Sequence, residues 1–128
     1  MQYLLAHDLG TSGDKASLFT VDGTLVKSVV ASYPCSYGSG NCVEQNPEAW
    51  YAAVCRTTQS LASLVDPARI AGVSFSGHMM GAVLLDGSGA LLRPAIIWAD
   101  QRAVSEQALL SQRVGRSEEH TSELQSQH

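Results

Sequence analysis

A polar turn that contains glycine lies between two apolar runs near the start of this 128-residue chain. The turn reads Asp8-Leu9-Gly10-Thr11-Ser12-Gly13-Asp14-Lys15, with Tyr3-Leu4-Leu5-Ala6 before it and Ala16-Ser17-Leu18-Phe19 after it. Apolar runs of this length on either side of a glycine turn predict two paired strands. The two glycines let the backbone turn tightly and approach a ligand closely. The stretch therefore predicts a strand–turn–strand unit whose backbone amides are available to an anion.

Two interpretations of this turn remain open from its residues alone. Thr11 and Ser12 add hydroxyl groups to the exposed amides, and Lys15 adds a positive charge that suits a phosphate. Asp8, at the end of the first strand, is suited to hold Mg²⁺ through water. The alternative is an ordinary hairpin in which these residues only satisfy turn geometry. The turn lacks the Gly-Lys-Ser/Thr ending of a Walker loop and the Gly-x-Gly-x-x-Gly of dinucleotide folds.

The segments after the turn predict an α/β arrangement. Asp22-Gly23 is a hairpin signal, so we expect strands over 15–21 and 25–31. Residues 32–46 contain glycine, serine, tyrosine and proline without periodicity and predict a loop. His7 alternates with Asp8 along the first strand and points to the opposite sheet face, so we interpret it as structural.

A helix is predicted to begin at Asn46-Pro47, with Asn46 as its cap and proline at its first position, and to end near Val65. Its apolar stripe comprises Trp50, Ala53, Val54, Thr57, Leu61 and Leu64. Trp50 belongs to this stripe, so we interpret it as a core anchor, with a ligand platform as the alternative.

The last predicted elements follow that helix. A strand is expected over 70–76, and a strand reached through a helix is best placed parallel to the first one. Residues 82–92 predict another hairpin, 94–98 a short extended run, and a helix is expected to begin near Asp100.

Composition and charge exclude several classes of protein. The net charge is −4, and no cluster of lysine and arginine is present, which argues against nucleic acid as a partner. No apolar run approaches the ~20 residues of a membrane span, and no signal peptide opens the chain, so we expect a cytoplasmic protein without a membrane partner. Cys35 and Cys42 could bridge, but three reduced thiols, Cys55 included, are expected in a cytosolic chain.

The last thirteen residues differ from the rest. Residues 116–128 read RSEEHTSELQSQH and show no apolar periodicity. They resemble the translation of a sequencing adapter fused to a truncated reading frame, with a genuine polar tail as the alternative. We therefore divide the chain into a domain at 1–115 and a non-native tail at 116–128.

Three stretches together resemble one family. The turn DLGTSGDK is similar to the first phosphate motif of the sugar-kinase, chaperone and actin superfamily. GHMMGAVLLD at 77–86 and RPAIIWADQR at 93–102 resemble the FGGY carbohydrate kinases, nearest to their xylulokinase branch. The resemblance runs from about Tyr3 to about Arg102. It implies an α/β, ribonuclease-H-like N-terminal lobe that is incomplete, and three antiparallel strands, a helix and a parallel strand match its opening.

By this resemblance, the chain carries part of a site for ATP and Mg²⁺. Asp8 would organise the metal, and the residues facing the ATP phosphates would be Gly10, Thr11, Ser12, Gly13 and Lys15. Phosphoryl transfer depends mostly on positioning and charge neutralisation, which is the role these groups would serve.

The resemblance also implies an acceptor site. Met79 and Met80 occupy positions that touch the sugar, although xylulokinases often carry histidine where Met80 stands, while here His78 precedes both methionines. Core filling is the alternative for the two methionines. Trp98 would offer an apolar face to the sugar and Asp100 would accept a hydroxyl, the alternative being a buried tryptophan and a helix cap. Arg102 is interpreted as an ion-pairing surface residue.

The implied function is that of an ATP-dependent kinase of a pentulose such as xylulose, or of a related sugar or polyol. The family's catalytic base is an aspartate downstream, so no catalytic base is assigned in this chain. The chain itself is expected to be an inactive, truncated lobe. A non-metabolic ATPase of the actin and chaperone superfamily is the alternative, although it would not share the second and third motifs. The sequence leaves open which sugar is used and whether the full-length parent is a homodimer.

Overall fold

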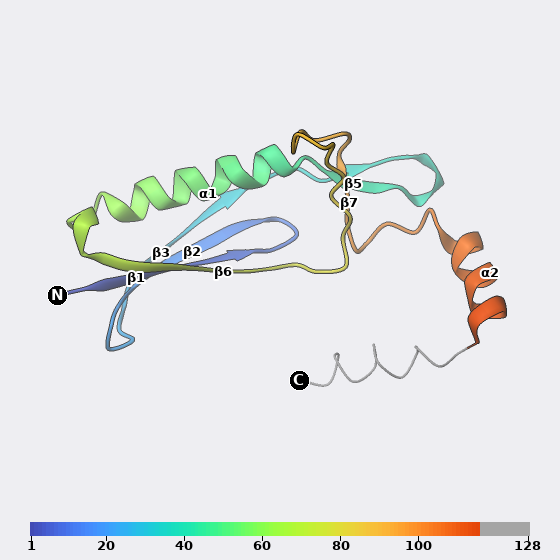
Figure 1. The fold of residues 1–128 in the computed structure, drawn as a ribbon. Helices are drawn as coiled ribbons and strands as arrows, with labels where there is room; N and C mark the ends of the chain where they lie inside the picture. The colour runs from blue at the N-terminus through green and yellow to red at the C-terminus, as the bar shows by residue number, and fades with distance from the viewer. Residues whose placement is uncertain (116–128) are drawn as a thin grey trace.

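Residues 1–115 are described by a computed structural model of the chain (Figure 1), and the tail predicted for 116–128 lies outside these residues. The α-helices and strands, in chain order, are β1 (Tyr3–Leu9), β2 (Gly13–Thr20), β3 (Leu25–Ser32), β4 (Ser36–Tyr37), β5 (Val43–Gln45), α1 (Pro47–Ala62), β6 (Ile70–Gly77), β7 (Ala95–Ile96) and α2 (Val104–Val114). Short 3₁₀ turns, η1 (Ser39–Asn41) and η2 (Pro67–Arg69), precede β5 and β6.

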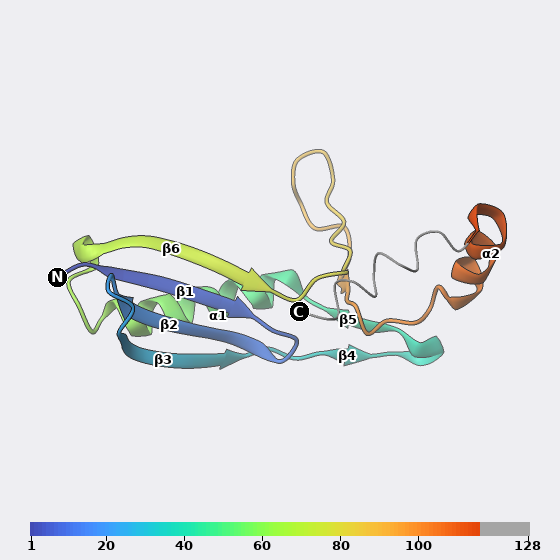
Figure 2. The ribbon, with the colours of Figure 1, turned by 90° about the horizontal axis from the view of Figure 1, so that it is seen from below.

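The main sheet has the strand order β3-β2-β1-β6. Strands β1, β2 and β3 are antiparallel neighbours, whereas β6 runs parallel to β1 (Figure 2). Three antiparallel strands, a helix and a parallel strand were predicted in this order, and the prediction is confirmed. The register places Asp8 of β1 between Lys15 of β2 and Ser76 of β6. These three residues mark the end of the sheet at which β1 and β6 both finish.

Helix α1 lies along one face of this sheet and contacts β1, β2 and β3 (Figure 1). The Asn46 side chain accepts a hydrogen bond from the Glu48 amide at 3.0 Å, and Pro47 is the first helical residue, so the predicted cap is confirmed. The helix ends at Ala62, slightly before the predicted end near Val65. Its buried residues and the sheet residues of the core beneath it are Ala53, Thr57, Leu61, Leu5, Ala16 and Leu18.

The prediction of a loop over 32–46 is wrong, because this segment contains β4, η1 and β5. Strand β5 pairs with β4 and also with β7, which lies about fifty residues further along the chain. Two- and three-residue strands leave no alternation that a sequence window can detect, and their pairing depends on a distant partner. This small sheet lies beyond the end of the main sheet at which β6 finishes (Figure 2).

The segment after β6 is less regular than predicted. Residues 82–92 form a hairpin-like loop held by a bridge between Leu85 and Leu91 rather than by two full strands. Helix α2 begins at Val104, later than the predicted start near Asp100, and none of its residues is buried. A helix without a buried face among residues 1–115 has no partner there to fix its start.

The three cysteines at 35, 42 and 55 are free thiols in the structure, as expected. Neither α1 nor α2 is long and apolar enough to cross a membrane, and these are the α-helices of residues 1–115.

Candidate active site

The turn between β1 and β2 is held by its carbonyl groups. The Tyr33 hydroxyl donates to the Gly10 carbonyl, and the Tyr33 amide donates to the Ser12 carbonyl at 3.1 Å. The remaining carbonyl, of Thr11, accepts a hydrogen bond of 2.6 Å from Nε2 of Gln45. All three carbonyls of the turn are therefore engaged by the protein. This arrangement fixes the turn from its acceptor side.

Two backbone amides of the same turn, by contrast, have no protein partner among the described residues. The amide nitrogens of Thr11 and Ser12 donate to no acceptor within residues 1–115, whereas the Gly10 amide bonds to the Gly13 carbonyl at 3.0 Å. Backbone amides that lack a protein acceptor, beside two hydroxyl groups, form a site suited to an anion. The turn lines a hollow of about 270 Å³ together with residues of β1, β2 and β3, namely Asp8, Gly10, Thr11, Ser12, Gly13, Lys15, Val30 and Ser32.

Gly13 is required where the turn enters β2. A Cβ at this position would lie 2.7 Å from the Ala31 carbonyl oxygen, which is too close for any side chain. Gly10 is less constrained, since its nearest neighbour would be the Gly13 carbonyl at 3.6 Å. The second glycine of the motif therefore serves the close packing of β2 on β3.

Asp8 and Lys15 are exposed cross-strand partners at the mouth of this hollow. The Asp8 carboxylate forms no hydrogen bond or ion pair with any of the described residues. Carboxylate oxygens are the donors that Mg²⁺ prefers, and Mg²⁺ usually retains several waters and needs only one or two carboxylates. No group of three or more metal-ligating side chains occurs within residues 1–115. A single open carboxylate beside the turn fits a water-mediated site for Mg²⁺.

His7 lies on the opposite face of β1, where it is buried under α1. Its Nδ1 atom is 2.9 Å from Oδ2 of Asp14, and the Thr57 hydroxyl donates to the same oxygen at 2.6 Å. The ring also stacks on Phe75 of β6, with the ring centroids 4.9 Å apart. These contacts confirm the interpretation of His7 as structural. Asp14 is fully buried, although its place in a polar sequence motif gave no sign of this.

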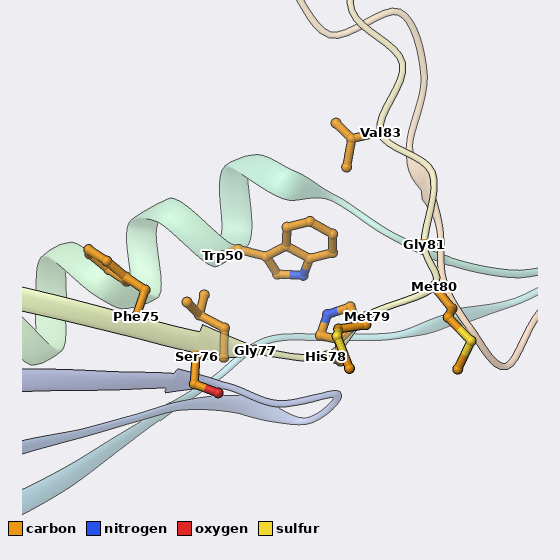
Figure 3. A pocket seen from close by; sticks show the side chains of 10 residues that line it. Trp50, Phe75, Ser76, Gly77, His78, Met79, Met80, Gly81 and Val83 are labelled. Carbon is orange, nitrogen blue, oxygen red and sulfur yellow. The ribbon is translucent and has the colours of Figure 1, made fainter. Parts of the chain in front are cut away.

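A second hollow, of about 510 Å³, lies beside the end of β6 (Figure 3). Trp50 of α1, His78 and Met79 line it, and the Trp50 and His78 rings meet edge to face with centroids 5.3 Å apart. Met79 and Met80 are 72% and 82% exposed, so neither belongs to the hydrophobic core formed by residues 1–115. Met80 has φ of 59°, a left-handed conformation that is uncommon outside glycine and concentrates at ligand sites.

Trp50 differs from its sequence interpretation. It is only partly buried and forms a wall of the 510 Å³ hollow, so the interpretation as a core anchor is wrong for residues 1–115. The helical stripe placed it correctly on the inner face of α1, but at the first turn of the helix that face extends past the end of β6. A stripe predicts the direction of a side chain and not the extent of the sheet beneath it.

Trp98 approaches the turn between β1 and β2 rather than the 510 Å³ hollow. Its Nε1 atom donates to Oγ1 of Thr11 at 3.0 Å, and the side chain is 54% exposed. The structure therefore brings the third sequence motif against the first one. An exposed indole at this position leaves an apolar face open beside the turn.

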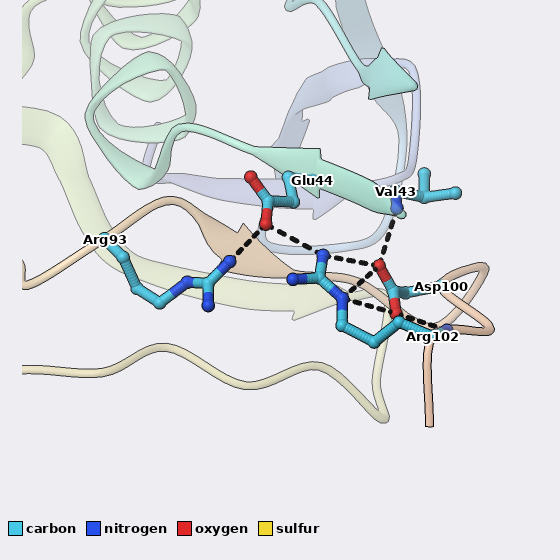
Figure 4. A network of polar contacts seen from close by, with 5 residues as sticks. All are labelled: Val43, Glu44, Arg93, Asp100 and Arg102. Carbon is cyan, nitrogen blue, oxygen red and sulfur yellow. Dashed lines mark hydrogen bonds and ion pairs between the residues drawn. The ribbon is translucent and has the colours of Figure 1, made fainter. Parts of the chain in front are cut away.

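Asp100 is already engaged by other parts of the protein (Figure 4). Its Oδ2 atom accepts hydrogen bonds of 2.6 Å from the Val43 amide and from Nη2 of Arg102, and Oδ1 accepts from the Arg102 amide at 3.0 Å. Arg102 also reaches Glu44 at 2.8 Å, and Arg93 pairs with the same Glu44 carboxylate. These ion pairs confirm Arg102 as an ion-pairing residue and attach the segment after β7 to β5.

The pKa values in this network follow its contacts. The Arg102 side chain, with help from the Val43 amide, holds the pKa of Asp100 well below its usual range despite partial burial. Arg102 likewise lowers the pKa of Glu44. Both carboxylates are therefore ionised at neutral pH. The contacts described for Asp100 hold the chain in place, and its role toward a sugar stays a prediction.

Gln45 is a site residue that sequence reasoning missed. It is 2% exposed, and its amide lies between the Thr11 carbonyl and the Trp50 indole. The segment 32–46 was predicted to be a loop, and loops run over the surface, so this prediction implied no buried polar side chain. A glutamine just before a capped helix start is the only local sign.

Comparisons with known proteins identify relatives of this chain. The model of the FGGY family of carbohydrate kinases, N-terminal domain, matches residues 3–127. The chain is 38% identical over 117 residues to the xylulose kinase of Klebsiella pneumoniae, covering 91% of this chain and 24% of that protein. It is 36% identical over 101 residues to the gluconokinase of Bacillus subtilis, covering 79% of this chain and 20% of that protein.

The ligand-bound xylulose kinase of Lactobacillus acidophilus superimposes with a TM-score of 0.84 at 29% identity, over 88% of this chain and 23% of that one. The fold is thus the ribonuclease-H-like fold of the sugar kinases, as predicted. The chain belongs to the FGGY family of carbohydrate kinases, as part of its N-terminal domain. The resemblance to xylulokinases is confirmed. The chain spans about a quarter of the length of these relatives.

Proposed function

We propose that this chain is the N-terminal part of an ATP-dependent kinase that phosphorylates a hydroxyl group of a pentulose, such as xylulose, or of a related sugar or polyol. The observation that carries this proposal is the turn at 10–12, whose three carbonyls are bonded to the protein while the amides of Thr11 and Ser12 donate to no acceptor among residues 1–115. A turn held in this way presents backbone amide donors and no open backbone carbonyl to a phosphate group.

The residues of the turn would bind and orient the phosphates of ATP. The Thr11 and Ser12 amides and hydroxyls would donate hydrogen bonds, and Lys15 would offset the negative charge. Gly10 and Gly13 would allow the close approach of the backbone. Asp8 would hold water of the metal shell, and bound Mg²⁺ would neutralise charge on the transferring phosphoryl group.

The sugar would lie between Met79-Met80 and the proposed phosphate turn at 10–12. Met79 and Met80 are exposed beside the 510 Å³ hollow, and Trp98 presents an apolar face next to Thr11. This arrangement would bring an acceptor hydroxyl close to the phosphate end of the nucleotide, which is the positioning that phosphoryl transfer requires. Asp100 remains a predicted sugar ligand through its carboxylate.

The rest of the catalytic machinery is proposed to lie outside this chain. The family's base and adenosine site are expected downstream, so residues 1–128 alone should bind a pentulose weakly or not at all and should not turn over ATP. The boundary at residue 115 also stays a prediction, and the family match that runs on to residue 127 weighs against it. A cytoplasmic location remains part of the proposal.

The test is a coupled assay on the longer protein obtained by recovering the reading frame beyond Gly115. ATP, Mg²⁺ and D-xylulose, with D-gluconate and glycerol in parallel, should give sugar-dependent ADP release at ~1–100 per second. ADP release that needs no sugar would favour a non-metabolic ATPase. In the same assay, the 128-residue chain should show no sustained ADP release. Turnover by this chain would overturn the hypothesis that it is an inactive, truncated lobe.

A further inference from the structure

Gln45 connects the wall of the 510 Å³ hollow to the phosphate turn through the two ends of its amide. Its Nε2 atom donates to the Thr11 carbonyl at 2.6 Å, and its Oε1 atom accepts from the Trp50 indole at 3.0 Å. The side chain is buried, with 2% of its surface exposed. A buried amide is stable only when such partners are present, so both contacts matter to the fold.

The orientation of this amide follows from its partners. The Thr11 carbonyl can only accept and the Trp50 indole can only donate, so the reversed amide would lose both hydrogen bonds. The backbone of Gln45 is also fixed, because β5 pairs with β7 at Ala95, which is fully buried. Gln45 is therefore a rigid link with a defined direction.

Each end of this link belongs to a different part of the proposed site. Thr11 carries one of the two turn amides that have no acceptor within residues 1–115. Trp50 lines the hollow beside Met79 and meets the ring of His78 edge to face (Figure 3). The hydrogen bond from Gln45 to the Thr11 carbonyl holds the peptide group between Thr11 and Ser12 in one orientation. The amide of Ser12 belongs to this peptide group and is held with it.

We propose that Gln45 is a positioning residue, which holds the peptide between Thr11 and Ser12 so that its amide is presented to phosphate, and which is itself held by Trp50. This inference rests on the proposed kinase function. It also means that Trp50, which lines the 510 Å³ hollow, affects nucleotide binding through Gln45. Gln45 touches neither substrate; it acts through the turn.

Two variants, one at each end of the link, separate the two hydrogen bonds. Gln45→Glu keeps an acceptor for Trp50 but places a carboxylate against the Thr11 carbonyl, so the bond to the turn is lost. Trp50→Phe keeps an aromatic wall and removes the indole donor together with part of the ring. Gln59→Leu is the matched control, because Gln59 is an exposed residue of α1 whose side chain forms no hydrogen bond among the described residues.

The first measurement uses the 128-residue chain and needs no catalysis. In ¹⁵N–¹H spectra, Gln45→Glu should shift the amide signals of Thr11 and Ser12, and Trp50→Phe should shift them less. Gln59→Leu should leave them unchanged. Unmoved Thr11 and Ser12 signals in Gln45→Glu would overturn the positioning role, whatever the activity of the longer protein.

The second measurement is kinetic and uses the longer kinase. Gln45→Glu should raise the KM for ATP about five- to tenfold, the effect of one lost hydrogen bond, while the sugar KM stays within about twofold. Trp50→Phe should also raise the KM for ATP. A loss of kcat with both KM values unchanged would indicate a merely structural role and contradict the proposal. If the unsubstituted kinase shows no sugar-dependent turnover, the proposed function fails, and the spectra still decide the role of Gln45.

Discussion

The indole of Trp98 donates a hydrogen bond of 3.0 Å to the hydroxyl of Thr11, across a sequence separation of 87 residues. Thr11 belongs to the turn between β1 and β2, and Trp98 follows β7, so the contact joins the first and third sequence motifs. It places the end of the small sheet against the proposed phosphate site. The contact is exposed, so its energy is small while its geometric consequence is large.

A double-mutant cycle on this pair measures whether the contact exists in solution. Trp98→Phe removes the indole donor and Thr11→Val removes the hydroxyl acceptor. We expect a coupling free energy of about 0.5–1 kcal/mol from denaturant unfolding of the 128-residue chain, because the hydrogen bond is neutral and partly solvated. Additive effects of the two substitutions would show that Trp98 does not contact the turn.

Gly13→Ala should destabilise the chain by about 1–3 kcal/mol, the usual cost of forcing extra atoms into a packed position. The new Cβ would lie 2.7 Å from the Ala31 carbonyl oxygen and push β2 away from β3. Gly10→Ala is the matched control, since its Cβ would meet only ordinary contacts. Equal stabilities of the two variants by chemical denaturation would contradict the described packing of the turn.

Tyr33 should make stability depend on alkaline pH. Burial, followed by the charges of Asp14 and Asp8, raises the pKa of Tyr33 to about 12 from its ordinary value of 10.0. A pKa that is raised on folding means that the neutral phenol stabilises the folded chain below pH 10, and that this contribution is lost as pH rises toward about 12. The neutral hydroxyl is also the donor to the Gly10 carbonyl.

Unfolding free energies of the parent chain and of Tyr33→Phe should therefore converge between about pH 10 and pH 12. Tyr51→Phe, at an exposed position of α1, should show no such convergence. A stability difference for Tyr33→Phe that stays constant through this range would mean that the phenol is not held neutral by the fold.

Asp100 should contribute stability that disappears in acid. Arg102 lowers its pKa, so the ionised carboxylate stabilises the folded chain above its ordinary pKa of 3.8, and this contribution is lost as pH falls below that value. Asp100→Asn should lower the thermal midpoint of unfolding at pH 7. The difference in midpoint between the variant and the unsubstituted chain should narrow below about pH 4. Glu48→Gln, at the exposed start of α1, is the control that should change little at either pH. A gap that widens in acid would contradict the described network.

The sequence predicted the elements that carry local signals. The apolar runs on both sides of the turn, the Asp22-Gly23 hairpin and the Asn46 cap are each signals of only a few residues. They correctly predicted β1, β2, β3 and α1. The turn between β1 and β2 was also predicted from its glycines and polar residues, and its role toward phosphate stays a prediction. What the sequence could not show is which backbone groups of that turn would be satisfied.

The missed features depend on contacts between distant segments. Strand β5 pairs with β4 and, at Gln45, with Ala95 of β7, and neither segment signals the distant pairing by itself. Asp14 is buried on the sheet face beneath α1, where the Thr57 hydroxyl donates to its carboxylate, although the motif context suggested a polar turn residue. Asp100 was predicted from the resemblance to face a sugar, while the structure adds Arg102 and Val43 as its partners.

The most direct test of the account is Asp8→Ala in the longer kinase, with turnover and sugar binding measured separately. Asp8 is assigned to the metal and phosphates, so turnover should fall by more than about 100-fold while the calorimetric affinity for the sugar stays nearly unchanged. Asp66→Ala, an exposed aspartate away from the turn, should retain turnover. Turnover that persists while the sugar affinity collapses would show that the phosphate and acceptor sites have been assigned the wrong way round.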